Sequence, residues 1–537
     1  MQRRSQPMEN LYDACLAGNV EGLDAVAETL GPEAFTAPIT FTTPFALLCA
    51  QNGALVALEA IVKHPKLGPS VLAVEVMNGG IAHYAAMRNH VDVLEFIDRV
   101  LGVEFLRRPA QFANKTIAHV AADEGCAEVI SFIMTHPALG APFLREPAFD
   151  HGTTAAHIAA KGGKLDVLKR IENALGTKWL RMSVDKDGCN IAHFAAMRSD
   201  VDTVRYIATH PELCAAFVVK GGNGGTPVHY AAQYGNEPAL AFLIDHFGAD
   251  KISRMKAQGG QTVAHFAAIG GHASVLQLIH GHAAMRALFG GADDQGYLPV
   301  HWAAAHGKAD ALRAILELCG PATLRKTVGE PKRTIAHLAS AAGHIVVLDV
   351  LAENASWGVP LLKQRDDTGC TIGQQAALNG HIPVIAWIAD RIGPEFLRTT
   401  DKEGRTAAHG AAALGHDAVV AFLLSTNGVG PELLRRPDKD GHTVAYVAAV
   451  KGHLKVLKLL LPALGPEFML QGAKDGSTPE VRGSVHPAVS KFYKTEVKPA
   501  LVAAAPKAAG AAALPEGLTE EDLAPAKKSS KKKGGRK

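Results

Sequence analysis

The chain has 537 residues, of which 47% are hydrophobic and 6% aromatic, so it is long enough for several domains or for one continuous array. Its 55 lysines and arginines nearly balance its 52 aspartates and glutamates, and a formal charge of +3 excludes an argument from overall charge for nucleic acid or membrane binding. Seven cysteines without a C-x-x-C pair exclude a disulfide framework and a zinc site, which favours a reducing compartment. The chain lacks an apolar signal segment and any run of eighteen apolar residues, so we expect a soluble protein of the cytoplasm, with the nucleus as the alternative.

In chain order, a first unit at residues 11–18 precedes a short phrase that recurs along most of the sequence, for example Thr116-Ile-Ala-His119 and Thr262-Val-Ala-His265. The spacing of the phrase is about 36 residues, in the range of stacked supersecondary units. Gln374 and Tyr446 take the histidine slot in two units. The histidines of this slot are His83, His119, His157, His193, His229, His265, His301, His337 and His409.

The phrase Thr226-Pro227-Val228-His229-Tyr230-Ala231 nearly reproduces the signature T-P-L-H-x-A, so the chain resembles the ankyrin repeat family. The resemblance implies an all-α repeat solenoid of helix-turn-helix units with projecting β-hairpin loops, in about 13 units of about 36 residues. The units are longer than usual because a second phrase, such as Ile392-Gly-Pro-Glu-Phe-Leu-Arg, follows the second helix. We interpret it as a glycine-terminated helix followed by an extra buried turn.

The residues of one unit predict the same fold independently. Threonine or asparagine before the first helix, as at Thr154 and Asn190, can cap its free amides, and the alanine pairs that follow let helices approach closely. The second helix carries a narrow apolar stripe, as in Val93-Leu94-Ile97, which only stacking against neighbouring units can bury. Asp-x-x-Gly phrases between units predict turns at hairpin tips.

The ends of the array depart from the pattern. The first unit lacks the threonine and histidine, and a last hairpin at 475–479 is followed by no alanine pair, so we predict degenerate caps and a solenoid over residues 1–493. Residues 494–537 are rich in Ala, Pro and Lys and are predicted to form a disordered tail. The basic residues that end this tail are Lys527, Lys528, Lys531, Lys532, Lys533, Arg536 and Lys537.

The repeated histidines do not predict a metal or catalytic site. Zinc ligands lie about 2 Å from the ion, whereas equivalent residues of stacked units lie about one helix spacing apart. The family resemblance implies that these histidines hydrogen-bond the backbone of adjacent hairpins. A second series of histidines lies between the two helices of each repeat, as at His272 and His344, and we predict a structural role for it too. Without a nucleotide, hydrolase or metalloprotease motif, we predict no enzyme activity and no cofactor. Cys189 and Cys370 fall at hairpin tips, where exposed thiols are expected.

The positions that follow each alanine pair are the predicted binding surface, because the resemblance places them on the concave face. Exposed Met, Tyr, Arg and Leu side chains along a groove are typical of interface cores. The alternative is that these side chains curl into the stack. The candidate partner-binding residues of the concave face and hairpin tips are Met87, Arg88, Met197, Arg198, Tyr234, Ile269, Tyr297, His306, Leu378 and Leu414, with Arg333, Arg405 and His442 as further tip residues.

These features together predict a non-enzymatic scaffold or adaptor whose concave face binds another protein. One alternative is a nuclear or nucleic-acid-associated factor in which the basic tail binds nucleic acid or an acidic surface. The other is an effector that a bacterium delivers into a host cell. No membrane insertion and no small-molecule substrate are predicted.

Overall fold

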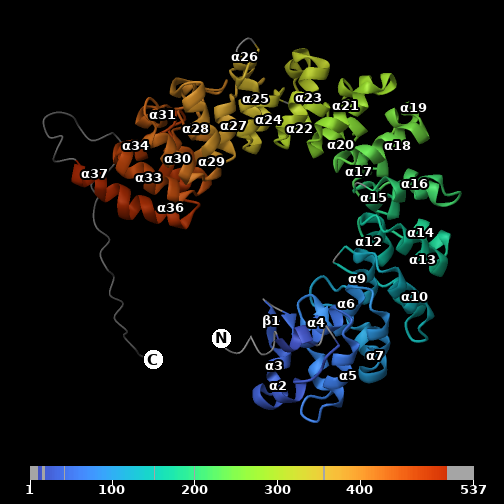
Figure 1. The fold of residues 1–537 in the computed structure, drawn as a ribbon. Helices are drawn as coiled ribbons and strands as arrows, with labels where there is room; N and C mark the ends of the chain where they lie inside the picture. The colour runs from blue at the N-terminus through green and yellow to red at the C-terminus, as the bar shows by residue number, and fades with distance from the viewer. Residues whose placement is uncertain are drawn as a thin grey trace, which may run out of the picture. The chain divides into compact units, whose positions relative to one another are not determined.

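The computed structural model describes residues 10–14, 18–40, 43–149, 151–198, 200–329, 331–354 and 357–504, which are mostly helical. The chain divides into two compact units, Met1–Asp294 (unit 1) and Gln295–Lys537 (unit 2) (Figure 1). Each unit repeats one motif, in which a short first helix, an antiparallel second helix and a short third helix follow one another. The basic residues of the predicted tail lie outside the described residues.

Unit 1 begins with α2 (Leu23–Leu30) and α3 (Glu33–Thr36), followed by the strand pairs β1 (Pro38–Thr40) with β2 (Thr43–Pro44) and β3 (Glu75–Val76) with β4 (Gly79–Gly80), both antiparallel. Its first helices are α4 (Phe45–Gln51), α6 (Ile81–Met87), α9 (Ile117–Glu124), α12 (Ala155–Lys161), α15 (Ile191–Ala196), α17 (Pro227–Gln233) and α20 (Val263–Gly270). Its second helices are α5 (Leu55–Lys63), α7 (Val91–Leu101), α10 (Ala127–Thr135), α13 (Leu165–Leu175), α16 (Val201–Thr209), α18 (Glu237–Phe247) and α21 (Ala273–Gly281). Its third elements are η1 (Pro69–Ala73), α8 (Val103–Arg107), α11 (Gly140–Leu144), α14 (Thr177–Met182), η2 (Leu213–Val218), α19 (Ala249–Ser253) and η3 (Ala283–Phe289).

Unit 2 continues the motif. Its first helices are α22 (Pro299–Ala305), α24 (Ile335–Ala342), α27 (Ile372–Leu378), α29 (Ala407–Leu414), α32 (Val444–Lys451) and α35 (Pro479–Gly483). Its second helices are α23 (Ala309–Cys319), α25 (Ile345–Ala352), α28 (Ile382–Arg391), α30 (Asp417–Ser425), α33 (Leu454–Leu464) and α36 (Pro487–Phe492). Its third elements are η4 (Pro321–Arg325), α26 (Gly358–Leu362), η5 (Pro394–Arg398), α31 (Gly430–Arg435) and α34 (Pro466–Leu470), and the described chain ends with η6 (Tyr493–Val497) and α37 (Lys498–Ala504).

The core of each unit lies between its helix layers. Consecutive first helices pack against each other through the alanine pairs, and both members of the pair Ala231 and Ala232 are fully buried. The apolar stripes of the second helices, such as Leu240 and Leu243, are also fully buried. Each buried leucine contributes about 1.5–3 kcal/mol relative to exposure, and that burial needs a neighbour on each side.

The third element is the extra buried turn predicted from the second recurring phrase, and that prediction is confirmed. Gly393 ends the second helix with φ +112°, and Leu397 of η5 is 1% exposed. The expected β-hairpins are shorter than predicted. Within the described residues, two strand pairs form, and Ala148–Thr153, Val184–Asn190 and Val328–Arg333 make isolated bridges, because a turn closed by one or two backbone bonds is too short for a ladder.

The carboxyl-terminal cap extends further than predicted. Tyr493 is fully buried and donates a hydrogen bond from its hydroxyl to the carbonyl of Met469 (3.2 Å). Helix α37 then continues to Ala504, with Val497 and Leu501 buried. The chain is therefore helical for eleven residues past the predicted boundary, while the tail beyond Ala504 lies outside the described residues.

Candidate partner-binding surface

The recurring histidines are framework groups. In the repeat that contains α15, the backbone N–H of Asn190 donates to Nδ1 of His193 (3.1 Å). Nε2 of His193 donates to the carbonyl of Gly225 in the next hairpin (3.1 Å). His337 makes the same two bonds, to Thr334 (3.4 Å) and Cys370 (3.0 Å). Both ring nitrogens are therefore engaged, and the predicted hydrogen bonding to adjacent hairpins is confirmed at these positions.

Burial keeps these imidazoles neutral. Desolvation lowers the pKa of His119, His157, His193 and His229 to about 4 in each case, although carbonyl hydrogen bonds partly oppose the shift. The rings of His157, His193 and His229 also pack against aromatic side chains of the following repeat, with centroids 5.0 Å apart for His193 and Tyr230. At His157 and His193, a neutral, doubly hydrogen-bonded ring inside the stack joins one repeat to the next.

The second histidine series joins consecutive repeats at the other end of the first helix. Nε2 of His272 donates to the carbonyl of Gln233 in the preceding unit (2.9 Å), and His344 bonds Ala305 in the same way (3.0 Å). Gly235 lies beneath His272, where a Cβ atom would meet Nδ1 at 2.5 Å, and its φ of +75° also favours glycine. These bonds satisfy carbonyls that a helix end leaves without an internal partner.

The predicted binding residues lie where these first helices end. Tyr234 is 52% exposed and stacks on Tyr230, with ring centroids 6.3 Å apart. Arg88, Arg198 and His306 are exposed, whereas Met87, Met197 and Ile269 are half-buried. The backbone carbonyls of this region are already bonded by the next unit, so the side chains are the groups left for a partner.

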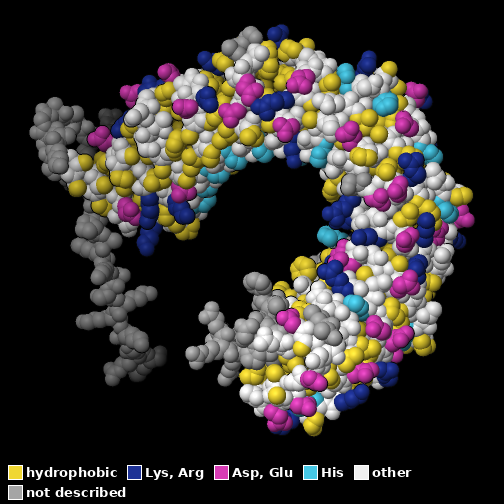
Figure 2. Space-filling model, viewed as in Figure 1, with side chains coloured by type: hydrophobic (Ala, Val, Ile, Leu, Met, Phe, Trp, Pro, Cys, Tyr) yellow, Lys and Arg dark blue, Asp and Glu magenta, His cyan; other side chains and the backbone are white. Residues whose placement is uncertain are grey.

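Unit 2 carries an apolar patch on its first helices α27 and α29, formed by Leu378, Gly410 and Leu414. The structure places Leu378 over Gly410, where an added Cβ would lie 3.0 Å from its Cγ, and Leu414 is 56% exposed one turn further along α29. Figure 2 shows hydrophobic side chains and histidines gathered along the edge of unit 2 where α22 to α29 lie, whereas charged side chains are interspersed over unit 1.

The predicted hairpin-tip residues are tied to their own turns. Tyr297 is half-buried and packs against Trp302 (centroids 5.6 Å apart), and Nε of Arg405 bonds Asp401 (2.8 Å). Nδ1 of His442 lies 3.1 Å from Oδ2 of Asp438. Asp440 lies close enough to join them around a cation, but Asp438 already accepts hydrogen bonds from the backbone N–H groups of Asp440 and His442. These hydrogen bonds stabilise the turn, and they account for the close approach of the three residues.

Other tip residues were missed by the sequence analysis. Met77 and Phe112 are 69% and 60% exposed, and the N–H of Phe112 donates to the carbonyl of Met77 (2.8 Å), so consecutive tips lie side by side. An apolar residue within a turn was the only sequence signal. The expectation of exposed thiols was wrong: Cys189 and Cys370 are 4% and 7% exposed, because Tyr230 and Gln375 cover them.

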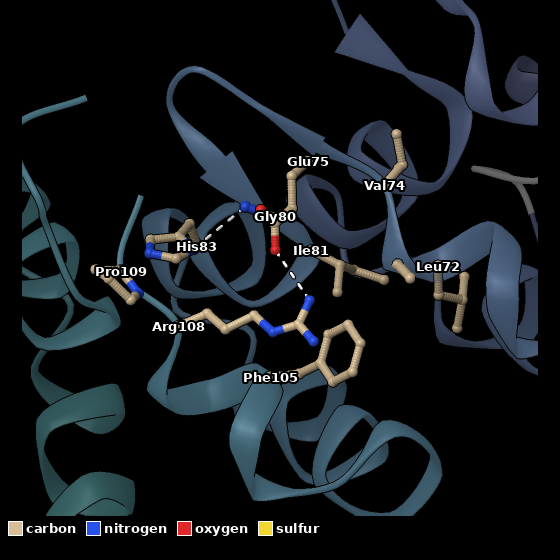
Figure 3. A pocket seen from close by; sticks show the side chains of 10 residues that line it. Leu72, Val74, Glu75, Gly80, Ile81, His83, Phe105, Arg108 and Pro109 are labelled. Atoms are coloured by element: carbon tan, nitrogen blue, oxygen red, sulfur yellow. Dashed lines mark hydrogen bonds and ion pairs between the residues drawn. The ribbon is translucent and has the colours of Figure 1, made fainter. Parts of the chain in front are cut away.

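A small cavity lies beside the β3–β4 hairpin (Figure 3). The guanidinium of Arg108 lies 3.8 Å from the ring centroid of Phe105 and 3.1 Å from the Glu75 carboxylate, and His83 and Ile81 complete the wall. Its volume of about 10 Å³ admits one water molecule at most. This cavity is an inter-repeat contact and has no room for a ligand.

The stacked helix pairs define a helical repeat protein. A family model described as ankyrin repeats (three copies) matches residues 171–255 and 392–471. The match confirms the resemblance predicted from the T-P-L-H-x-A phrase, and these residues carry ankyrin repeats. Such repeats generally mediate protein–protein interaction, and the family is typically non-enzymatic. No curated protein matches the chain.

Among the described residues, no helix is both long and apolar enough to cross a membrane. The exact number of repeat units stays a prediction.

Proposed function

We propose that the protein is a non-enzymatic scaffold or adaptor that binds another protein through the ends of its first helices. The observation that carries this proposal is the contrast between framework and surface in the same helices. The histidine, threonine and alanine positions are buried, and His193 and His337 bond the next repeat, whereas Tyr234 and Leu414 are more than half exposed.

The exposed groups support a protein partner in particular. Tyrosine, methionine, arginine and leucine side chains supply large contact areas, and aromatic, methionine and arginine residues are enriched in interface cores. Tyr234 is held by stacking on Tyr230, so little side-chain freedom is lost when it is covered.

The test compares two paired variants of the tagged full chain in its native cells by quantitative mass spectrometry of the proteins retained. Met197→Ala with Tyr234→Ala removes the unit 1 groups, and Leu378→Ala with Leu414→Ala removes the unit 2 patch. The matched control is Val56→Ala with Val346→Ala, which removes two valines that are each 55% exposed on second helices.

We expect each paired variant to lose partners that the control retains, because truncating an interface anchor costs at least about 1–2 kcal/mol in binding. Equal retention in all variants would refute the proposal. A chain ending at Ala504 is run beside them, and loss of every partner from it would assign binding to the basic tail.

A further inference from the structure

The second helices make a regular contact on the side of each unit away from the first helices. The fifth side chain of one second helix reaches the sixth side chain of the next. Nζ of Lys169 lies 5.3 Å from the ring of Tyr206, the guanidinium of Arg205 lies 4.4 Å from the ring of Phe242, and Trp387 donates a hydrogen bond to Asp349 (2.7 Å).

One member of this series lies in a groove. Between α16 and α18 lies a shallow, open groove with a volume of about 590 Å³. Its lining residues are Val201, Arg205, Pro238, Phe242, Asp245 and His246. Phe242 is half-buried and packs in parallel with His246, so the floor is a flat aromatic surface.

Arg205 differs from the other arginines of the second helices. Arg170 pairs with Glu128 (2.7 Å), Arg313 with Glu353 (2.6 Å), and Arg99 and Arg391 lie within 4 Å of Glu59 and Asp390. Across the described residues, Arg205 has no carboxylate within ion-pair distance, and its guanidinium is held only against Phe242. A guanidinium that lies over a ring still offers N–H groups to a planar anion.

We propose that this groove binds a peptide segment of a partner protein that presents a carboxylate to Arg205 and an apolar side chain to Val201 and Pro238. Charge complementarity supports this occupant, because a carboxylate would supply the counter-ion that this arginine lacks. Asp245 lies one helical turn past Phe242 and favours an amine at that end of the segment.

The helix spacing sets the pattern of the segment. Val201 and Arg205 are four residues apart, as are Pro238 and Phe242, which is about 6 Å along a helix. Two residues of an extended peptide span nearly the same distance. The apolar, acidic and basic side chains should therefore alternate with spacer residues.

The probe is the blocked pentapeptide acetyl-Leu-Gly-Glu-Gly-Lys-amide, together with its reversed sequence, since an extended peptide can lie along the groove in either direction. It is titrated into the full-length protein to about 10 mM, a range that covers the weak affinity of so short a ligand. The methyl groups of Val201 report binding by NMR. We expect saturable shifts with one of the two peptides.

Two comparisons isolate the carboxylate contact. Replacing Glu by Gln in the peptide, or making Arg205→Gln in the protein, should weaken binding about tenfold or more, since a charged hydrogen-bonded pair is lost. The matched control Lys169→Gln removes the equivalent stacked cation one repeat earlier and should leave binding unchanged. If Arg205→Gln unfolds the protein, Arg205→Lys tests the same point, because lysine keeps the charge and loses the planar fork.

Absence of saturable shifts, or equal affinity for the Glu and Gln peptides, would overturn the proposal. Glutarate is titrated separately, and shifts as strong as those of the peptide would assign the groove to small carboxylates and overturn the peptide occupant.

Discussion

The buried histidines should make the stability of unit 1 depend steeply on pH between 7 and 5. His119, His157, His193 and His229 have a pKa of about 4 in the folded protein, against an ordinary value of 6.5. Between these two values the unfolded chain binds more protons than the folded chain, so stability is present above pH 6.5 and is lost as the pH falls toward 4.

The size of the effect follows from the shifts. At pH 5 the unfolded histidine is almost fully protonated and the folded one almost fully neutral, which costs about 2 kcal/mol for each group. Four such groups within one unit would together remove about 8 kcal/mol, comparable with the whole stability of an ordinary domain.

The chain itself suggests the substitution that tests this reasoning. Gln374 occupies the histidine slot in one unit, where it accepts a hydrogen bond from the N–H of Thr371 (2.9 Å) and donates one to the carbonyl of Arg405 (2.7 Å). His157→Gln should therefore keep the bond to Thr154 at the helix start and the inter-repeat bond to Ser183 while removing a titratable group. At pH 7 it should cost about 1 kcal/mol, mainly through loss of the ring contact with Phe194.

The assay is urea denaturation of the full chain at pH 7 and pH 5, followed by circular dichroism. We expect the loss of stability between the two pH values to be about 2 kcal/mol smaller in His157→Gln than in the parent protein. His151→Gln, which replaces a histidine whose side chain is 72% exposed, is the control. The same pH dependence in the parent and in His157→Gln would refute the linkage to buried histidines.

Four further outcomes follow from the structure. Gly235→Ala should lower the free energy of unfolding in urea by more than Gly248→Ala does. Both glycines have a positive φ, which costs an alanine about 1 kcal/mol, but only at Gly235 would the added Cβ also clash with His272. Equal losses in the two variants would contradict this. Thr154→Ala should cost about 1 kcal/mol by the same measurement, since it removes the Oγ1 bond to Nδ1 of His157 (2.9 Å), and no loss would show that this bond contributes nothing net. Burial raises the pKa of Cys370 to about 11, so mass spectrometry after brief thiol labelling at pH 8 should find Cys214 modified before Cys370, and the reverse order would show that the tip opens readily. Tyr234→Ala should change unfolding free energy by about 0.5 kcal/mol or less, whereas Leu240→Ala should cost about 2–5 kcal/mol; a large loss from Tyr234→Ala would mark it as framework.

Much of the fold was predictable from the sequence because its determinants are local and periodic. The Thr-x-x-His phrase encodes a capped helix start, and the bonds of Thr334 and His337 show why those two residue types recur at that spacing. The alanine pairs and the narrow stripes of the second helices required neighbours on both sides, which the repeat supplies. The extra turn could be predicted for the same reason, since the phrase that contains Gly393 and Leu397 recurs in other repeats.

The surface was less predictable, because exposure depends on what the adjacent unit places nearby. Cys189 was expected at an exposed tip, but Tyr230 of the next unit covers it. The positions of the proposed binding residues at the ends of the first helices followed from their register, whereas the unpaired state of Arg205 depends on which side chains adjoin it in space. The sequence by itself therefore determined the repeat and its core, which rest on hydrogen bonds within three residues and on periodic burial. Only the tertiary structure decided which surface groups are covered, stacked or left without a counter-ion, because those properties belong to contacts between residues about forty positions apart.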